Sequence, residues 1–151
     1  MSRINVRIML AVVATTALAS TAYAVTPLAC NNATVVGTYS VNGSGQHQKS
    51  DKSARIVPLT FSGMIAFNPS TGRYSLKAQL QMADGMMREL PMTTGTYQVD
   101  QACHINFQQT AQTKMPIWHG VVSNGGNSIT GGFNEENHKT HSIMTRVSAS
   151  Y

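Results

Sequence analysis

Charged and aromatic residues are both scarce in this chain of 151 residues. Asp, Glu, Lys and Arg together contribute 11% of the residues, and Phe, Trp and Tyr contribute 7%. So few aromatic residues argue against an outer-membrane β-barrel, which needs two aromatic girdles. The basic residues are scattered along the chain rather than clustered, so we expect no nucleic-acid partner.

Catalytic and metal-binding motifs are also missing. Only Glu89, one of six acidic residues, falls on a plausible strand, whereas a paired-carboxylate site needs two such groups held together. The five histidines form no His-x-His pair and no helical pair, and no G-x-S-x-G motif is present. The sequence therefore indicates no catalytic residue and no cofactor, and its acidic residues and histidines form no metal-binding motif.

Residues 1–24 have the layout of a secretory signal peptide. Arg3 and Arg7 precede a short apolar run that is too short to span a membrane, and small residues follow at a cleavage site. We expect cleavage after Ala24, with Ala19 as the alternative, and one exported domain over residues 25–151, either periplasmic or secreted. Without Arg3 and Arg7, nine basic residues oppose six acidic ones, a formal charge of +3.

The chain has only two cysteines, Cys30 and Cys103, and no C-x-x-C motif. In an oxidising compartment, two such cysteines are most simply explained by one disulfide bond. This bond would tie the N-terminal segment to a strand late in the chain.

Strand patterns and turn residues alternate along the rest of the chain. Residues 73–82 place Tyr74 and every second residue to Met82 on one face, with polar residues on the other, as in a strand with one wet face. The polar, Gly- and Ser-rich residues 42–54 are predicted to form a loop. The other predicted strands are 34–41, 55–67, 86–90, 91–99, 103–110, 115–122, 128–133 and 141–151.

Eight or nine strands with short connections favour antiparallel neighbours. Closure into a barrel removes exposed strand edges, so we predict an all-β, up-and-down antiparallel barrel of about eight strands. A β-sandwich is the alternative.

The chain resembles a class of small exported bacterial proteins with lipocalin-like (calycin-like) barrels and no settled activity. The resemblance rests on Cys30 before Gly37–Tyr39, on the hairpin Phe67–Tyr74, and on Gly95–Val99 followed by Cys103. It implies the barrel fold and no catalytic residue. The two G-T-Y repeats suggest two strands that lie close together at one end of the barrel, each with a tyrosine ring on one face.

An apolar pocket inside the barrel is the predicted site. The segment 73–82 contributes an inward apolar face, residues 86–92 contribute adaptable methionines, and the only tryptophan lies on a later strand. The candidate pocket residues are Tyr74, Leu76, Leu80, Met87 and Trp118.

The leading functional hypothesis is an exported barrel that binds an apolar or amphipathic small molecule, or that acts as an interaction module, rather than an enzyme. Three alternatives stay open: an outer-membrane barrel associated with lipid, a cyclase or isomerase that acts by shape, and a Cu(I)-binding protein. The last would use the thioethers of Met82, Met86, Met87 and Met92. The sequence does not predict an oligomeric state.

Overall fold

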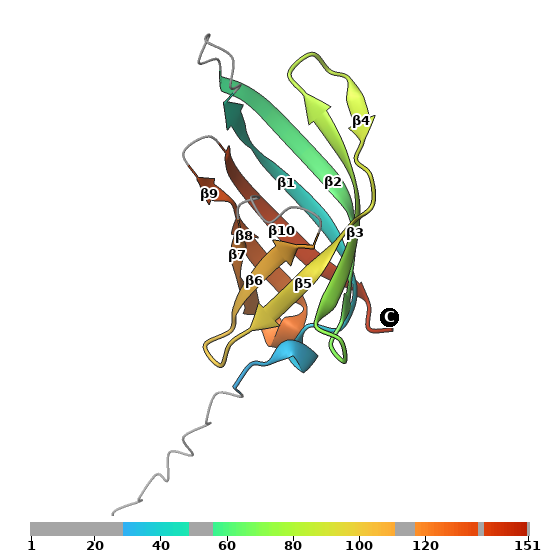
Figure 1. Ribbon diagram of the computed structural model, residues 1–151, viewed down its shortest axis with the longest axis vertical. Helices are drawn as coiled ribbons and strands as arrows, with labels where there is room; N and C mark the ends of the chain where they lie inside the picture. Colours follow the sequence, from blue (N-terminus) through green and yellow to red (C-terminus); the bar gives the residue numbers. More distant parts are fainter. Residues whose placement is uncertain (1–28, 49–55, 111–116, 136–137, 151) are drawn as a thin grey trace, which may run out of the picture.

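A computed structural model of the protein describes residues 29–48, 56–110, 117–135 and 138–150 (Figure 1). The predicted signal peptide lies outside these residues, as do Asp51 and Glu136. The strands are β1 (Gly37–Gln48), β2 (Ile56–Asn68), β3 (Arg73–Met82), β4 (Met87–Glu89), β5 (Thr93–Val99), β6 (His104–Gln109), β7 (Trp118–Ser123), β8 (Ser128–Gly132), β9 (Asn134–Glu135) and β10 (His138–Ser148). Two single-turn 3-10 helices, η1 (Asn32–Thr34) and η2 (Asn124–Gly126), accompany them, and neither is long enough to cross a membrane.

The strands form one closed antiparallel barrel, as the sequence predicts. Eight strands follow one another around the wall in the order β1, β2, β3, β5, β6, β7, β8 and β10, and β10 pairs back with β1. All the pairings in this wall are antiparallel, because each strand is joined to the next by a short turn or loop. The closed barrel therefore rules out the β-sandwich alternative.

The short strands β4 and β9 continue strands of the barrel wall. β4 and β5 pair with the same edge of β3, because β2 occupies the other edge. β3 has residues 77 and 78 between its pairings with Thr93 and Glu89, whereas the β4–β5 segment has residues 90–92 between the same two pairings. The extra residue on the β4–β5 side is a β-bulge. Pro91 lies at this bulge and has no N–H to donate, so the ladder breaks there.

The predicted loop at residues 42–54 is wrong in its first half, because β1 continues to Gln48. In this part of β1, Asn42, Ser44 and Gln46 face outward, whereas Gly43 and Gly45 lie on the inner face opposite Phe61 and Leu59, and His47 follows them on that face. A Cβ atom on Gly43 would collide with the ring of Phe61, so this glycine makes room for an aromatic side chain on the neighbouring strand. The polar, glycine-rich sequence therefore forms a barrel strand with an unusual inner face.

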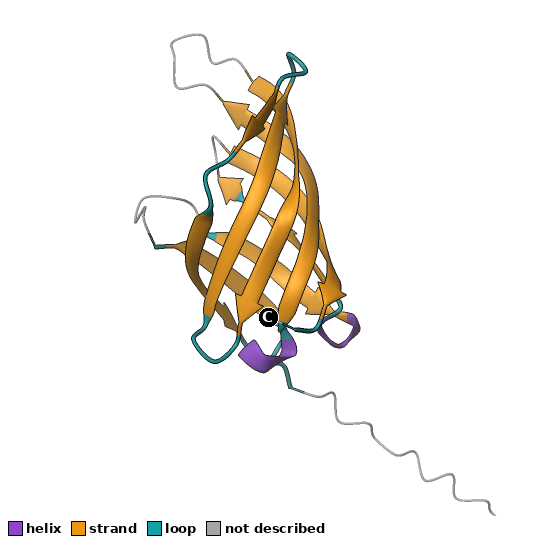
Figure 2. Ribbon diagram, turned by 90° about the vertical axis from the view of Figure 1, so that its right-hand side faces the viewer, coloured by secondary structure: helices purple, strands orange, loops and turns teal. Residues whose placement is uncertain are grey.

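The strands on the two sides of the barrel differ in length. The adjacent strands β10, β1, β2 and β3 have 10 to 13 residues, whereas β5, β6, β7 and β8 have 5 to 7. The long strands project beyond the short ones at one end (Figure 2). We call this the open end, and we call the opposite end, where η1 and η2 lie, the closed end.

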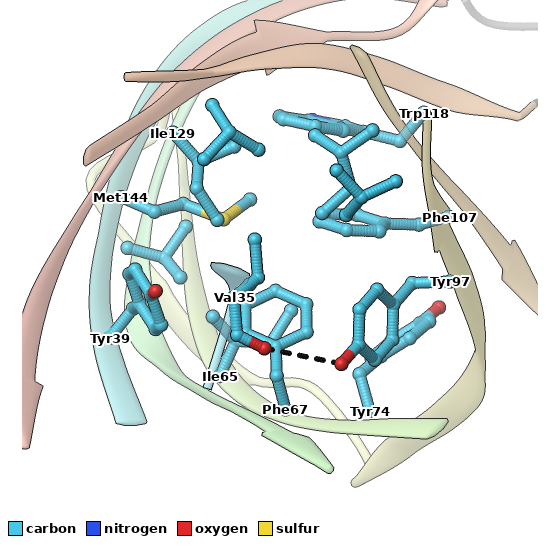
Figure 3. Packing of buried hydrophobic residues seen from close by; sticks show 14 of the residues in the cluster. Val35, Tyr39, Ile65, Phe67, Tyr74, Tyr97, Phe107, Trp118, Ile129 and Met144 are labelled. Atoms are coloured by element: carbon cyan, nitrogen blue, oxygen red, sulfur yellow. Dashed lines mark hydrogen bonds between the residues drawn. The ribbon is translucent and has the colours of Figure 1, made fainter. Parts of the chain in front are cut away.

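Aromatic side chains fill the barrel toward the closed end (Figure 3). The ring of Phe67 is fully buried, and its centroid lies 5.3 Å from that of Tyr39 and 4.9 Å from that of Tyr97. These tyrosines belong to the two G-T-Y repeats, so the repeats do bring two rings together on one core residue. Phe67 also lies 5.4 Å from Phe107, which extends the aromatic contacts toward the middle of the barrel.

The N-terminal segment covers the closed end. Val35 is fully buried under the barrel, and the Tyr97 hydroxyl donates a hydrogen bond to its carbonyl over 3.2 Å. The guanidinium of Arg146 donates to the Thr34 carbonyl (2.8 Å) and to the Tyr39 hydroxyl (2.8 Å). Strand β10 is thereby linked to both η1 and β1.

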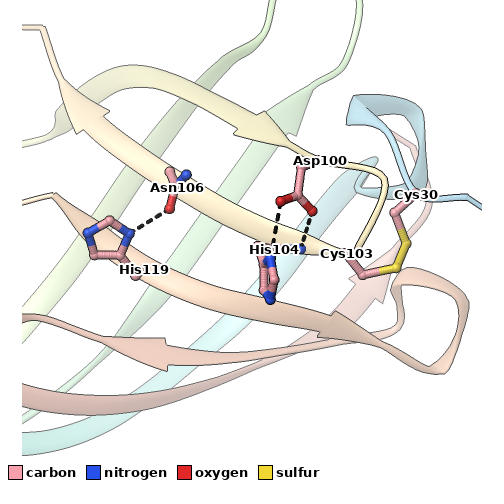
Figure 4. Close-up of polar contacts among 6 residues, drawn as sticks. All are labelled: Cys30, Asp100, Cys103, His104, Asn106 and His119. Atoms are coloured by element: carbon pink, nitrogen blue, oxygen red, sulfur yellow. Dashed lines mark hydrogen bonds and ion pairs between the residues drawn. A yellow bond between two sulfur atoms is a disulfide. The ribbon is translucent and has the colours of Figure 1, made fainter.

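The two cysteines form the predicted disulfide bond at this end of the molecule (Figure 4). The Cα atoms of Cys30 and Cys103 are 5.0 Å apart, which lies within the range that a disulfide can bridge. The bond joins the segment before η1 to the start of β6, and it closes a chain separation of 73 residues.

Candidate ligand site at the open end

A small cavity lies between the aromatic core and the open end of the barrel. Its volume is about 80 Å³, which is well below the ~300 Å³ of the smallest typical drug-sized pockets. The cavity can hold the end of a chain-like molecule and not a whole drug-sized ligand. Its walls come from six strands and the Phe133 junction between β8 and β9, and the lining residues are Val41, Phe61, Ile65, Tyr74, Leu76, Phe107, Gln109, Trp118, Phe133, Ser142 and Met144.

The sequence-predicted pocket residues divide into two groups. Tyr74, Leu76 and Trp118 line the cavity. Leu80 lies on the same face of β3, two residues beyond Ala78 toward the open end, and it is half-buried. Met87 does not join them, because it lies opposite Gln81 on the outer face and is 55% exposed.

The Met87 position follows from the turn before β4. Residues 83–85 reverse the chain, and the register of β4 against β3 then places Arg88, rather than Met87, on the same face as Leu80. A shift of one residue in the register of a strand exchanges its two faces, so the order of residues alone could not settle this point.

Trp118 forms one wall of the cavity. Its ring stacks on Phe107, with centroids 4.5 Å apart and planes at 11°. A Cβ atom on Gly120 or Gly131 would collide with the Trp118 ring, so these two glycines create the space that it fills. The single tryptophan is therefore held rigidly at the cavity, where its fluorescence would respond to a ligand.

The cavity has few polar groups. The indole N–H of Trp118 donates to the Ser142 hydroxyl over 3.2 Å, and this hydroxyl donates in turn to the Gly131 carbonyl over 3.3 Å. Ser142 is thus satisfied within the wall, and the half-exposed Gln109 is the other polar side chain among the lining residues. The site offers apolar contact rather than a polar recognition pattern.

Burial changes the acidity of the tyrosines in the barrel. Burial raises the pKa of Tyr74 to about 12, and burial together with the charge of Tyr39 raises the pKa of Tyr97 to about 12. Burial also raises the pKa of Tyr39, although the hydrogen bond from Arg146 opposes this effect. At neutral pH all three hydroxyls are protonated, so the cavity wall at Tyr74 is uncharged.

Several cavity residues were not among the sequence candidates, notably Val41, Phe61, Phe107 and Met144. The alternation of residues 103–107 already placed Phe107 on an inward face, so that residue could have been found from the sequence. Val41, Phe61 and Met144 are joined to the site by pairings between strands up to about one hundred residues apart, for which the local pattern carries no signal.

The outer face carries two histidines with fixed ring orientations (Figure 4). His104 Nδ1 lies 3.1 Å from Asp100 Oδ2, and His119 Nδ1 lies 2.6 Å from Asn106 Oδ1. A hydrogen bond from the His104 backbone N–H is the main cause that lowers the pKa of Asp100. Both histidines are exposed and point away from the barrel interior, and the described residues contain no group of three or more His, Cys, Asp or Glu suited to a metal ion.

Comparison with known proteins adds no family. No protein-family model matches the chain, and no curated protein matches it in sequence. The chain is a small all-β protein with a closed eight-stranded antiparallel barrel, a buried aromatic core and one disulfide.

Proposed function

We propose that the protein binds an apolar or amphipathic molecule through the open end of its barrel. The observation that carries the proposal is the contrast between the two ends of the inner face. The aromatic core fills the closed end. Toward the open end Leu59 is buried, but the inward side chains of Phe61, Leu76 and Leu80 are only half-buried. Half-buried apolar side chains on a concave surface are the usual lining of a ligand site.

The outer face supports a barrel surrounded by water rather than by lipid. The outward side chains of β3 are polar or charged (Arg73, Ser75, Lys77, Gln79 and Gln81), whereas a lipid-facing barrel requires an apolar band around its outside. Val121 and Ile143 are exposed apolar residues on the outer face, but in the part of the chain that the structure describes Thr130 lies between them and Asn42 lies on the other side of Ile143, so polar residues interrupt the row.

Export and the lipocalin-like character of the barrel belong to the same proposal. A disulfide bond suits an oxidising compartment, in agreement with the leader sequence at residues 1–24. A barrel with one capped end and one open end is a suitable shape for carrying a small molecule outside the cytoplasm.

The experiment is a titration of the purified protein with decanol, a neutral amphiphile, followed by Trp118 fluorescence and by calorimetry. We expect saturable binding with a dissociation constant in the micromolar range or weaker, about −8 kcal/mol or less favourable. The cavity accepts only the end of the chain, so most of the ligand stays in contact with half-exposed side chains and gains less from burial.

The matched variants are Leu80→Asn on the inner face of β3 and Gln79→Asn on its outer face. Loss of Leu80 should weaken decanol binding about fivefold, since roughly 1 kcal/mol of apolar contact disappears, and loss of Gln79 should leave binding unchanged. No saturable binding by either method, or equal effects of the two substitutions, would contradict the proposal.

A further inference from the structure

The register of β4 places a positive charge beside the half-buried apolar residues of the open end. Arg88 pairs with Leu80 of β3, and residues that lie directly opposite each other in an antiparallel pair project to the same face. Leu80 projects to the inner face together with Phe61, its partner on β2. The Cβ atom of Arg88 therefore lies on the inner side of the barrel wall, whereas the neighbouring Glu89 lies opposite Gln79 on the outer side.

The Arg88 guanidinium is available to a ligand. The side chain is exposed, and within the described part of the chain it makes no hydrogen bond and no ion pair. An arginine fork matches the geometry of a carboxylate or a phosphate.

The distance from the cavity to Arg88 suits a molecule with a tail and a head. Leu76 lines the cavity, and Leu80 lies four residues farther along β3, which corresponds to about 13 Å of extended strand. Phe61, which lies opposite Leu80 on β2, also lines the cavity, so the apolar lining extends from the Leu76 level to the Leu80 level. Between these levels β3 places Ala78 on the inner face. A chain whose end fills the cavity would therefore place its other end near the Arg88 guanidinium.

We propose that the open end selects amphiphiles with an anionic head group, which pairs with Arg88 while the apolar tail lies along β3 toward the cavity. This inference rests on the proposed function and deepens it, because it states the charge of the ligand. The carboxylate of a free fatty acid and the phosphate of a lysophospholipid share this chemistry, and one probe of each kind separates them.

The test compares decanoate with decanol, which have tails of the same length, on wild-type protein and on two charge-removing variants. R88Q removes the charge at the open end, and R73Q removes an equal charge from an exposed residue on the outer face of β3 near the closed end. We expect R88Q to weaken decanoate binding two- to fivefold, the range for an exposed ion pair, and to leave decanol binding unchanged. R73Q should alter neither, and R88K should retain the preference for decanoate.

Ionic strength provides a second readout. Raising the salt concentration to about 1 M shortens the screening length to about 3 Å, so wild-type protein should then bind decanoate no better than R88Q does. A short-chain lysophosphatidate is the phosphate probe, and a larger effect of R88Q on it than on decanoate would assign the site to phosphate heads.

The outcomes separate the two proposals. Decanol binding that is saturable, with decanoate binding unaffected by R88Q or equally affected by R73Q, would overturn the anionic selectivity and leave the binding function standing. Failure of every probe to bind would overturn both. Far-ultraviolet circular dichroism of each variant confirms that the barrel is intact.

Discussion

The closed end of the barrel is surrounded by all eight strands, whereas only the long strands β10, β1, β2 and β3 reach the open end (Figure 2). At the closed end, Tyr39, Phe67 and Tyr97 pack with almost no exposure, and η1, Arg146 and the disulfide cover them. At the open end, the inward residues Phe61 and Leu80 stay half-buried because the facing strands are too short to cover them. The comparison indicates that stability is concentrated at one end, which leaves the other free to bind.

The largest expected effect comes from removing one phenylalanine ring from each end, which tests whether the two ends contribute differently to the free energy of unfolding. Phe67→Ala should lower the free energy of unfolding by about 3–5 kcal/mol, because it leaves a cavity in a fully buried aromatic cluster. Phe61→Ala should cost less than half as much, since Phe61 is half-buried and solvent can enter the space. Urea denaturation followed by circular dichroism measures both. Equal losses would show that the two ends contribute alike.

Removal of the disulfide tests the covering of the closed end. The double substitution Cys30→Ser and Cys103→Ser should lower the free energy of unfolding by about 2–5 kcal/mol, mainly because the unfolded chain gains freedom. While the variant is folded, decanol affinity should not change, because the bond lies at the end opposite the site. A parallel loss of stability and of ligand affinity would refute the independence of the two ends.

High pH provides the smallest and most local perturbation. The pKa of Tyr74 and of Tyr97 is raised to about 12 in the folded protein, against about 10 when unfolded. Between these values the unfolded chain loses tyrosine protons that the folded barrel retains, so the free energy of unfolding falls as the pH rises from about 10 to about 12. Below pH 10 this contribution is fully present.

The Tyr74→Phe variant checks that explanation. Removing one buried hydroxyl should reduce the fall in stability over this pH interval, and the tyrosinate absorbance that the variant loses should be the part that appears near pH 12 in the folded protein. Ionisation of Tyr74 and Tyr97 near pH 10 in the folded protein would show that these two rings are in contact with water.

Much of the fold could be predicted because burial of one strand face produces an alternation of apolar and polar residues along the sequence. The alternation in residues 73–82 and in 103–107 identified the inward faces of β3 and β6 correctly. Where glycines occupy the inner face, as at Gly43, this alternation is absent, so the sequence predicts a loop at residues 42–54 although β1 continues to Gln48. The same limit applies to Arg146, whose charge conceals its place between η1 and Tyr39.

The sequence by itself determined the all-β character, the faces of the regular strands and the partners of the disulfide, since a chain with two cysteines has only one intramolecular pairing. Only the tertiary structure decided which strands are long neighbours, that Arg88 rather than Met87 shares the face of Leu80, and how large the cavity is. These properties depend on register between strands that are distant in the chain. Register is set by the packing of the whole inner face, because each strand can shift until its buried side chains fit those of its neighbours.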